Sequence, residues 1–352
     1  MHPTRTLAAR LVLIALFVTS VSIRSTASTP ITARAFHVEE QWGIGGTGGW
    51  GFLAIDPVAH RLFIPRTDHI SVVDTETGKA LAEITGMVNL RNVALDAGTY
   101  GYATDVTDGT AGFVRVFDRS SFKLVASIRT GPIPFAIVYD PATKRVFAFS
   151  SRGHSVDVID PSTNTVISTI PLAGRPGSAV GDGNGGIFVA LPAAGMIQHI
   201  DAASRTVAAS WLLAPCTGPS NLAIDAPHHQ LFTSCEDHSL ISVNAVTGKV
   251  DAIGEGTENA GDLDFDPQLN LLFLADSTGS LTLFRRESPS HYTRIQSVPT
   301  ASGARTMVVD HKAGKAYLVT SKYGQNSGKV SEELKFRPTP LPGTFSVLVV
   351  SR

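Results

Sequence analysis

Short runs in which apolar and polar residues alternate recur along this chain of 352 residues. Residues 71–75 (Ser-Val-Val-Asp-Thr) and 158–161 (Val-Ile-Asp-Pro) are two of them, and each ends in turn-forming residues. Turn sequences such as Thr77-Gly78-Lys79 then begin the next run. Long stretches with helical periodicity are hard to find after the N-terminus. The pattern therefore predicts an all-β protein of short strands joined by hairpins.

One turn residue repeats with a regular period. An aspartate follows an apolar run every 40 to 44 residues, and an aromatic residue comes six or seven positions after each. The aspartates are Asp56, Asp96, Asp140, Asp182, Asp225, Asp266 and Asp310, and the aromatics are Phe63, Tyr102, Phe147, Phe188, Phe232, Phe273 and Tyr317. We expect the aspartates to brace hairpin turns through side-chain to backbone hydrogen bonds. Each unit holds four short strands, and one such sheet cannot bury both faces alone. Seven units arranged radially bury each other, which predicts a seven-bladed β-propeller of four-stranded antiparallel blades.

The ends of the chain share the last blade. The seventh unit supplies only three strands of its own, within residues 306–310, 316–320 and 345–351. Residues 36–42 provide the missing fourth strand, because their Val-x-x-x-Trp spacing matches that of Val207 and Trp211. We therefore expect the N-terminal strand to pair with the C-terminal strand, which leaves no unpaired sheet edge.

Two segments resemble a known repeat. Residues 154–166 (His-Ser-Val-Asp-Val-Ile-Asp-Pro-Ser-Thr-Asn-Thr-Val) and 70–79 (Ile-Ser-Val-Val-Asp-Thr-Glu-Thr-Gly-Lys) are similar to the second half of the YVTN-type repeat. From about residue 36 to its end, the chain resembles the YncE-like YVTN β-propeller proteins, most of which are exported bacterial proteins. The resemblance implies the fold and brings no shared catalytic motif. Some members of the family are described as binding single-stranded DNA, and others resemble the propeller parts of quinoprotein amine dehydrogenases. No quinone-forming motif is visible in this chain.

The N-terminus has the pattern of an export signal. Arg5 and Arg10 precede the apolar run 11–18, and the small residues Ser-Thr-Ala follow at 25–27. We interpret residues 1–27 as a signal peptide, with Ala35 as an alternative cleavage point and an uncleaved anchor as the alternative interpretation. Residues 36–352 then form a single propeller domain, located in the periplasm or secreted. No other run approaches the roughly 20 apolar residues of a transmembrane helix.

The charge balance bears on the partner. The formal net charge is -1, and the first 27 residues carry three of the 29 basic residues and none of the 30 acidic ones. The rest of the chain is therefore net negative, whereas nucleic-acid-binding proteins usually carry a basic surface. Nucleic acid is disfavoured as a partner. Single-stranded nucleic acid is kept as an alternative, because Trp50 and Tyr323 could stack on bases.

The two cysteines, Cys216 and Cys235, flank one predicted hairpin. Cys216 precedes the first strand of the fifth unit and Cys235 ends the second strand, so the hairpin brings both to one face. In an oxidising compartment such a pair predicts a disulfide with a structural role.

The default binding surface is the face where two sets of loops surround the channel: those from fourth to first strands and those from second to third strands. The residues expected just before the first strands are Trp50, Arg91, Arg175, Asn221, Asp262 and Arg305. The second set adds Arg66, Asp68, His69, Asp105, Asp108, Arg152, His154, Asp237 and His238. This charged and aromatic rim suits a polar ligand or a partner protein. The alternative is that these are ordinary solvated loops.

Four further features of the sequence bear on possible chemistry. Asp264 occupies a position that is Ala or Val in the other units, so it is either near the channel, where it could hold a cation, or buried with a partner. His69, His154 and His238 hold equivalent loop positions, but on alternate blades they are too far apart to predict a metal site. Residues 43–49 are glycine-rich without the βαβ context of a phosphate-binding loop, so they are interpreted as a flexible link. Residues 321–344 form a long loop, interpreted as disordered or as a lid or partner arm.

These features favour a non-catalytic binding or scaffold protein of the cell envelope, which binds a small polar ligand or an envelope protein on the channel-loop face. No sequence motif indicates a cofactor, a metal or a catalytic triad, and we expect a monomer. The alternative is a propeller enzyme, lactonase-like or lyase-like, that acts on a small polar substrate. Its acid, base and cation would come from Asp264 and His154 together with Asp262 and Arg305.

Overall fold

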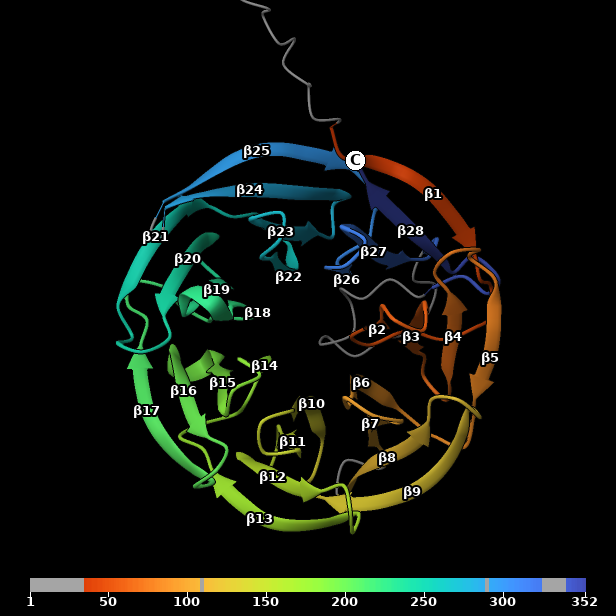
Figure 1. Ribbon diagram of the computed structural model, residues 1–352. Helices are drawn as coiled ribbons and strands as arrows, with labels where there is room; N and C mark the ends of the chain where they lie inside the picture. The colour runs from red at the N-terminus through yellow and green to blue at the C-terminus, as the bar shows by residue number, and fades with distance from the viewer. Residues whose placement is uncertain (1–34, 108–110, 289–290, 325–339) are drawn as a thin grey trace, which may run out of the picture. The chain divides into compact units, whose positions relative to one another are not determined.

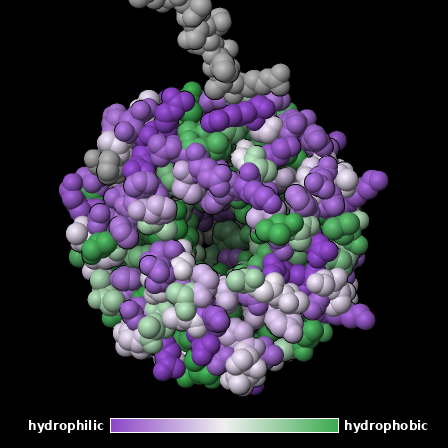
Figure 2. Space-filling view, in the orientation of Figure 1, coloured by the Kyte–Doolittle hydropathy of each residue, from purple (hydrophilic) through white to green (hydrophobic). Residues whose placement is uncertain are grey.

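The computed structural model describes residues 35–107, 111–288, 291–324 and 340–352. Residues 35–352 form one compact unit, in which seven four-stranded antiparallel sheets surround a common axis (Figure 1). In each sheet the strands run in order from the axis outwards, and a hollow lies at the centre of the space-filling view (Figure 2). The predicted seven-bladed β-propeller is confirmed.

The strands of the first four blades follow the chain. Blade 1 contains β2 (Ala54–Asp56), β3 (Arg61–Pro65), β4 (Ile70–Asp74) and β5 (Ala80–Ile84). Blade 2 contains β6 (Leu90–Leu95), β7 (Tyr100–Val106), β8 (Gly112–Asp118) and β9 (Lys123–Thr130). Blade 3 contains β10 (Pro134–Asp140), β11 (Arg145–Ser150), β12 (Ser155–Asp160) and β13 (Thr165–Pro171). Blade 4 contains β14 (Ala179–Gly181), β15 (Gly186–Leu191), β16 (Met196–Asp201) and β17 (Thr206–Leu212).

The last three blades complete the ring. Blade 5 contains β18 (Leu222–Asp225), β19 (Gln230–Ser234), β20 (Ser239–Asn244) and β21 (Val250–Glu255). Blade 6 contains β22 (Ala260–Asp266), β23 (Leu271–Asp276), β24 (Ser280–Ser288) and β25 (His291–Pro299). Blade 7 contains β26 (Thr306–Asp310), β27 (Lys315–Thr320), β28 (Ser346–Ser351) and, as its outer strand, β1 (His37–Gly43). Two 3-10 turns, η1 (Pro192–Ala194) and η2 (Ala226–His228), are the helical segments among the described residues. No helix in this part of the chain is long and apolar enough to cross a membrane.

Six of the seven repeated aspartates lie at or just after the end of a first strand and accept backbone hydrogen bonds in the following turn, as the sequence predicted. Asp225 differs, because its carboxylate contacts the side chains of His228 and Arg286. Asp56 Oδ1 accepts from the amides of Val58 and Ala59 at 3.1 and 2.9 Å. Asp310 Oδ1 accepts from the equivalent amides of Lys312 and Ala313 at 2.9 Å. These bonds satisfy backbone amides that would otherwise lack a partner in the turn between two strands.

Closure of the ring follows the predicted pairing of the two ends of the domain. Strand β1 pairs antiparallel with β28, with Val38 opposite Val350 and Trp42 opposite Val347. Trp42 is 9% exposed, its ring lies 5.8 Å from that of Tyr317, and it covers Gly78 in blade 1. The outer strand of blade 7 therefore carries an aromatic that locks this blade to the next one.

The predicted disulfide is present. Cys216 and Cys235 are joined on blade 5, between the segment before β18 and the end of β19. The predicted signal peptide and most of the predicted loop at 321–344 lie outside the described residues, and so does Asp108.

Candidate functional site

The two sets of loops meet on one face of the domain, as expected. In blade 1, the amide of Gly51 donates to the carbonyl of Pro65 at 2.9 Å, which joins the segment before β2 to the end of β3. In blade 5, the amide of Ser220 donates to the carbonyl of Ser234 at 3.0 Å, close to the disulfide. Side chains just before the first strands are therefore held against the loops between second and third strands.

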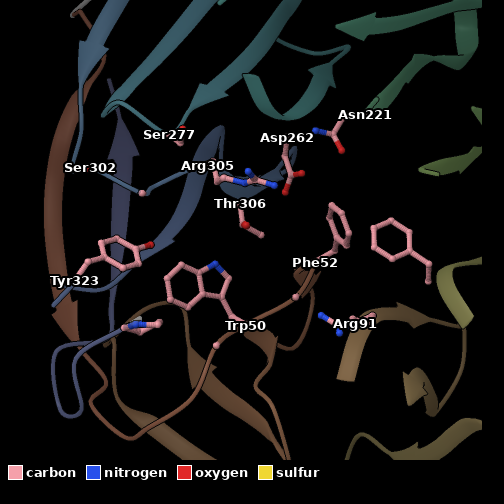
Figure 3. Close-up of a pocket in the computed structure, with 15 residues that line it drawn as sticks. Trp50, Phe52, Arg91, Asn221, Asp262, Ser277, Ser302, Arg305, Thr306 and Tyr323 are labelled. Atoms are coloured by element: carbon pink, nitrogen blue, oxygen red, sulfur yellow. The ribbon is translucent and has the colours of Figure 1, made fainter. Parts of the chain in front are cut away.

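A pocket of about 460 Å³ opens among these loops (Figure 3). That volume falls in the usual range for small-molecule sites. Segments before or within the first strands of blades 1, 2, 3, 5, 6 and 7 contribute to it, together with the residues that follow β27. The lining residues are Gly49, Trp50, Gly51, Phe52, Arg91, Phe135, Asn221, Asp262, Ser277, Ser302, Gly303, Arg305, Thr306, Tyr323 and Pro340.

Two glycines let neighbouring blades approach closely at the pocket. A Cβ atom on Gly51 would lie 2.0 Å from the carbonyl oxygen of Arg91, and the next amide, that of Phe52, donates to this oxygen at 2.8 Å. Gly261 repeats the arrangement, because a Cβ there would lie 2.1 Å from the carbonyl oxygen of Arg305. Larger residues at either position would push the blades apart and displace the side chains that line the pocket.

The wall near blade 1 is aromatic. The Trp50 ring lies 5.2 Å from Phe345 and 6.4 Å from Tyr323, and Phe52 packs edge-to-face on Phe135 at 5.6 Å. Trp50, Phe52, Phe135 and Tyr323 are all half-buried, so part of each ring faces the pocket. Partly exposed aromatic rings offer stacking surface to a flat ligand.

The glycine-rich segment 43–49 is fastened by a buried arginine. Arg66, at the end of blade 1's second-strand region, is 1% exposed, and its guanidinium lies 3.8 Å from the centre of the Phe345 ring. It donates to the carbonyls of Gly45, Thr47, Gly48 and Gly49 at 2.9 to 3.4 Å. We expected Arg66 on the exposed rim, and this was wrong. Its guanidinium instead holds the segment that carries Trp50.

Asp262, on β22, is the buried acid of the pocket. It is 9% exposed, and its Oδ2 accepts from the amide of Met307 on β26 at 2.9 Å. Among the described residues its Oδ1 has no hydrogen-bond partner. Burial raises the pKa of Asp262 to about 7, and the negative charge of Asp264 also raises it. The hydrogen bond from the Met307 amide and the positive charge of Arg305 lower this pKa by a smaller amount.

Arg305 supplies a positive charge beside this acid. Its side chain is exposed and lines the pocket, and Figure 3 shows its guanidinium next to the Asp262 carboxylate. Within the described part of the chain, the guanidinium makes no hydrogen bond or ion pair with a side chain or carbonyl. Five guanidinium donors are therefore open to solvent or to a ligand.

Asp264 lies two residues further along β22 and points at the same neighbouring strand. Its Oδ2 accepts from the amide of Val309 at 3.0 Å, and its Oδ1 is 3.0 Å from Nε2 of His311. Burial lowers the pKa of His311, but the hydrogen bond and charge of Asp264 outweigh it and raise this pKa above its ordinary value. Asp264 is thus engaged with protein partners and is not among the residues that line the pocket.

The pocket brings together five of the residues expected on the binding face: Trp50, Arg91, Asn221, Asp262 and Arg305. It does not include His154 or Arg175. His154 is exposed at the turn before β12, and Arg175 donates from Nε to the hydroxyl of Ser151 at 2.7 Å. Within the described residues, no group of three His, Cys, Asp or Glu side chains could hold a metal ion.

Sequence reasoning missed two of the aromatic residues of the site. Phe52 and Phe135 line the pocket, and neither was among the residues expected on the binding face. The available signal was their position, since an aromatic just before or at the start of a first strand faces the loops rather than the interior of a blade. Tyr323 had been considered only as a base-stacking residue.

A smaller pocket of about 280 Å³ adjoins the first and shares Arg305 and Ser277 with it. Its other charged residues, Glu236 and Glu258, are exposed. Arg305 therefore stands between an aromatic pocket and an acidic one.

No protein-family model and no curated protein matches the chain. Among solved structures, it is similar to Kuenenia stuttgartiensis hydrazine synthase, with a TM-score of 0.66 and 18% identity, covering 77% of this chain and 92% of that one. It is also similar to a chain of a mitotic checkpoint complex, with a TM-score of 0.69 and 13% identity, covering 89% and 96%. A third similar structure is U3-55K, with a TM-score of 0.68 and 10% identity, covering 86% and 95%. At these identities the similarity shows the propeller fold alone.

Proposed function

We propose that this protein is a non-catalytic binding protein, and that its ligand is a small polar molecule with an anionic group held in the pocket between blades 1, 6 and 7. The observation that carries the proposal is the Arg305 guanidinium, which is exposed at the pocket wall without a hydrogen-bond or ion-pair partner among the described residues. Arginine matches the geometry of carboxylate and phosphate oxygens in a two-pronged contact. The half-buried ring of Trp50 adds an apolar surface for the rest of the ligand.

A binding role accounts for the arrangement better than catalysis does. A propeller enzyme would need an acid, a base and a cation that converge on one reacting atom. Asp262 and Arg305 share the pocket, but Asp264 is hydrogen-bonded to Val309 and His311, and His154 lies outside the pocket. The lactonase-like or lyase-like alternative therefore lacks two of the four groups that we assigned to it.

We further propose that the protein belongs with the exported YVTN-type propellers and works in the cell envelope or outside the cell. The repeat residues 154–166, the signal-like residues 1–27 and the Cys216–Cys235 disulfide support this assignment. Disulfides persist mainly in oxidising compartments. Expression with and without residues 1–27, followed by cell fractionation, tests it, and a full-length protein that stays in the cytoplasm would contradict it.

The binding proposal is tested by a thermal-shift screen against small organic acids, their neutral amides, amines and short single-stranded DNA. A ligand that binds only the folded state raises the melting temperature. We expect shifts with organic acids alone, and we expect Arg305→Gln to abolish them. Arg294→Gln removes the same charge from the exposed outer strand β25 and is the matched control. Shifts that survive Arg305→Gln, or shifts with DNA alone, would overturn the proposal.

A further inference from the structure

We propose that the ligand is a zwitterion with a flat apolar group, of the chemical class of an aromatic amino acid. In this assignment Arg305 binds the carboxylate, Asp262 binds the ammonium group, and Trp50 and Phe52 contact the apolar group. The inference rests on the proposed function, because it names the ligand class of the same pocket.

The first step is the incomplete set of partners around Asp262. Its Oδ2 accepts one backbone amide, whereas its Oδ1 lacks a hydrogen-bond partner among the described residues, although the side chain is 9% exposed and lines the pocket. A buried carboxylate normally has its lone pairs satisfied by donors. A ligand with an ammonium group supplies this oxygen with both a donor and the opposite charge.

The second step is the relation between Asp262 and Arg305. Their charges interact, because Arg305 lowers the pKa of Asp262, yet the two side chains form no ion pair with each other within 4.0 Å. Opposite charges that are near but not in contact suit a ligand that carries an ammonium and a carboxylate group on one carbon atom. The α-ammonium and α-carboxylate groups of an amino acid have that arrangement.

The third step is the surface opposite these charges. In Figure 3, Arg305 and Asp262 lie on one side of the cavity, and the rings of Trp50 and Phe52 lie on the other. Phe135 extends this surface by its edge-to-face contact with Phe52 at 5.6 Å. Aromatic rings prefer to stack or pack edge-to-face on other rings, so a phenyl or indole group complements this wall.

A carboxylate without an ammonium group fits less well. It would satisfy Arg305 but would bring a second negative charge beside the buried Asp262 and leave Oδ1 without a donor. An amine without a carboxylate would satisfy Asp262 and would place its positive charge beside Arg305. The matched pair of charges therefore favours the zwitterion over either analogue.

Three probes that differ by one group each test this inference by isothermal titration at pH 8: phenylalanine, 3-phenylpropionate and phenethylamine. We expect phenylalanine to bind at least about tenfold more tightly than either analogue, as expected for one charge-assisted hydrogen bond in a buried site. Equal binding of phenylalanine and 3-phenylpropionate would overturn the inference while leaving the proposed function intact. No binding of any of the three would overturn the inference, and the proposed function falls with it only if the screen of organic acids also gives no shift.

Variants separate the two charges. Asp262→Asn keeps an oxygen for the Met307 amide, and we expect it to reduce the preference for phenylalanine over 3-phenylpropionate to less than about threefold. Arg305→Gln should weaken both ligands. Glu255→Gln removes a negative charge from the exposed outer strand β21 and should leave the preference unchanged. If Asp262→Asn keeps the full preference, Asp262 does not bind the ammonium group and the assignment is wrong.

Discussion

Replacement of Arg66 by Met tests how the glycine-rich segment is held beside the pocket. Met fills much of the same volume but lacks the guanidinium, so it removes the contacts to residues 45–49 and to the Phe345 ring without leaving a large cavity. We expect two results: a lower free energy of unfolding, and faster exchange of the backbone amides that precede Trp50.

The size of the effect follows from the individual contacts. The shortest bond, from Nη2 to the carbonyl of Thr47 at 2.9 Å, contributes about 1.5 kcal/mol as a bond from a charged donor, and the other three are long. The contact with Phe345 at 3.8 Å contributes about 2 kcal/mol in a desolvated site. Two effects reduce this stabilisation. Burial disfavours the charged guanidinium, as the lowered pKa of Arg66 indicates. Thr47 and Gly48 are exposed, so water can solvate their carbonyls in the variant. The net loss should be about 2 kcal/mol.

Urea unfolding followed by tryptophan fluorescence measures the loss, and hydrogen exchange measured by mass spectrometry reports on residues 44–49. Arg66→Lys is the matched control, because it keeps the charge but not the planar fork, and its loss should be intermediate. A buried arginine can sometimes be replaced by an apolar residue at no cost. An Arg66→Met variant within about 0.5 kcal/mol of the wild type, with unchanged exchange at 44–49, would therefore refute the role that we assign to Arg66.

Three further predictions concern stability. Replacing Cys216 and Cys235 by Ser should cost about 3 kcal/mol, because the bond closes a loop with a sequence separation of 19, and chemical denaturation with and without reductant measures this. Asp262→Asn should be more stable than the wild type at pH 8 by up to about 4 kcal/mol, with the gain vanishing near pH 4, because burial raises the pKa of this carboxyl from 3.8 to about 7. The wild type loses stability as pH rises from 3.8, where the carboxyl ionises in the unfolded chain, to about 7, where it ionises in the folded protein. Melting temperatures at the two pH values check the sign, and a gain that grows on acidification would contradict it. Trp42→Ala should cost about 3 to 5 kcal/mol by opening the contact between blades 7 and 1, as urea titration would show, whereas a cost below about 1 kcal/mol would mean that Trp42 does not lock the ring.

The fold could be predicted from the sequence because its determinants are local and repeated. Asp56 and Asp310 stand at opposite ends of the chain, yet both accept hydrogen bonds from amides two and three residues later. Such a turn needs no information from other blades, so its sequence pattern survives in every unit. Closure was also predictable, since Trp42 has the spacing of Trp211, and each covers a glycine in the turn of the next blade.

The site was harder to predict because it depends on where different blades meet. Arg66 follows β3 and Arg305 precedes β26, so the sequence places both in loops on the same face. Contacts from the chain ends bury one of them under Phe345, and the other is left exposed in the pocket. Asp105 is another example: it was expected on the rim, but it is fully buried and binds Arg115 at 2.8 Å. The exposure of a loop residue is set by its neighbours in space, which spacing along one chain does not reveal.

The pair Asp262 and Asp264 connects the architecture of the ring to the site. The innermost strand of a blade has no strand beyond it, so amides on its free edge lack partners unless a neighbouring blade supplies them. On β26 the amides of Met307 and Val309 are such donors, and the alternating carboxylates of β22 accept from both. Asp264 stands where the other units have Ala or Val, and its second oxygen contacts His311. Asp262 likewise accepts from an amide of β26, and its second oxygen has no hydrogen-bond partner among the described residues. A residue that closes the seam between two blades therefore also leaves an acceptor facing the pocket, which is why we expect stability and ligand binding to change together when Asp262 is replaced.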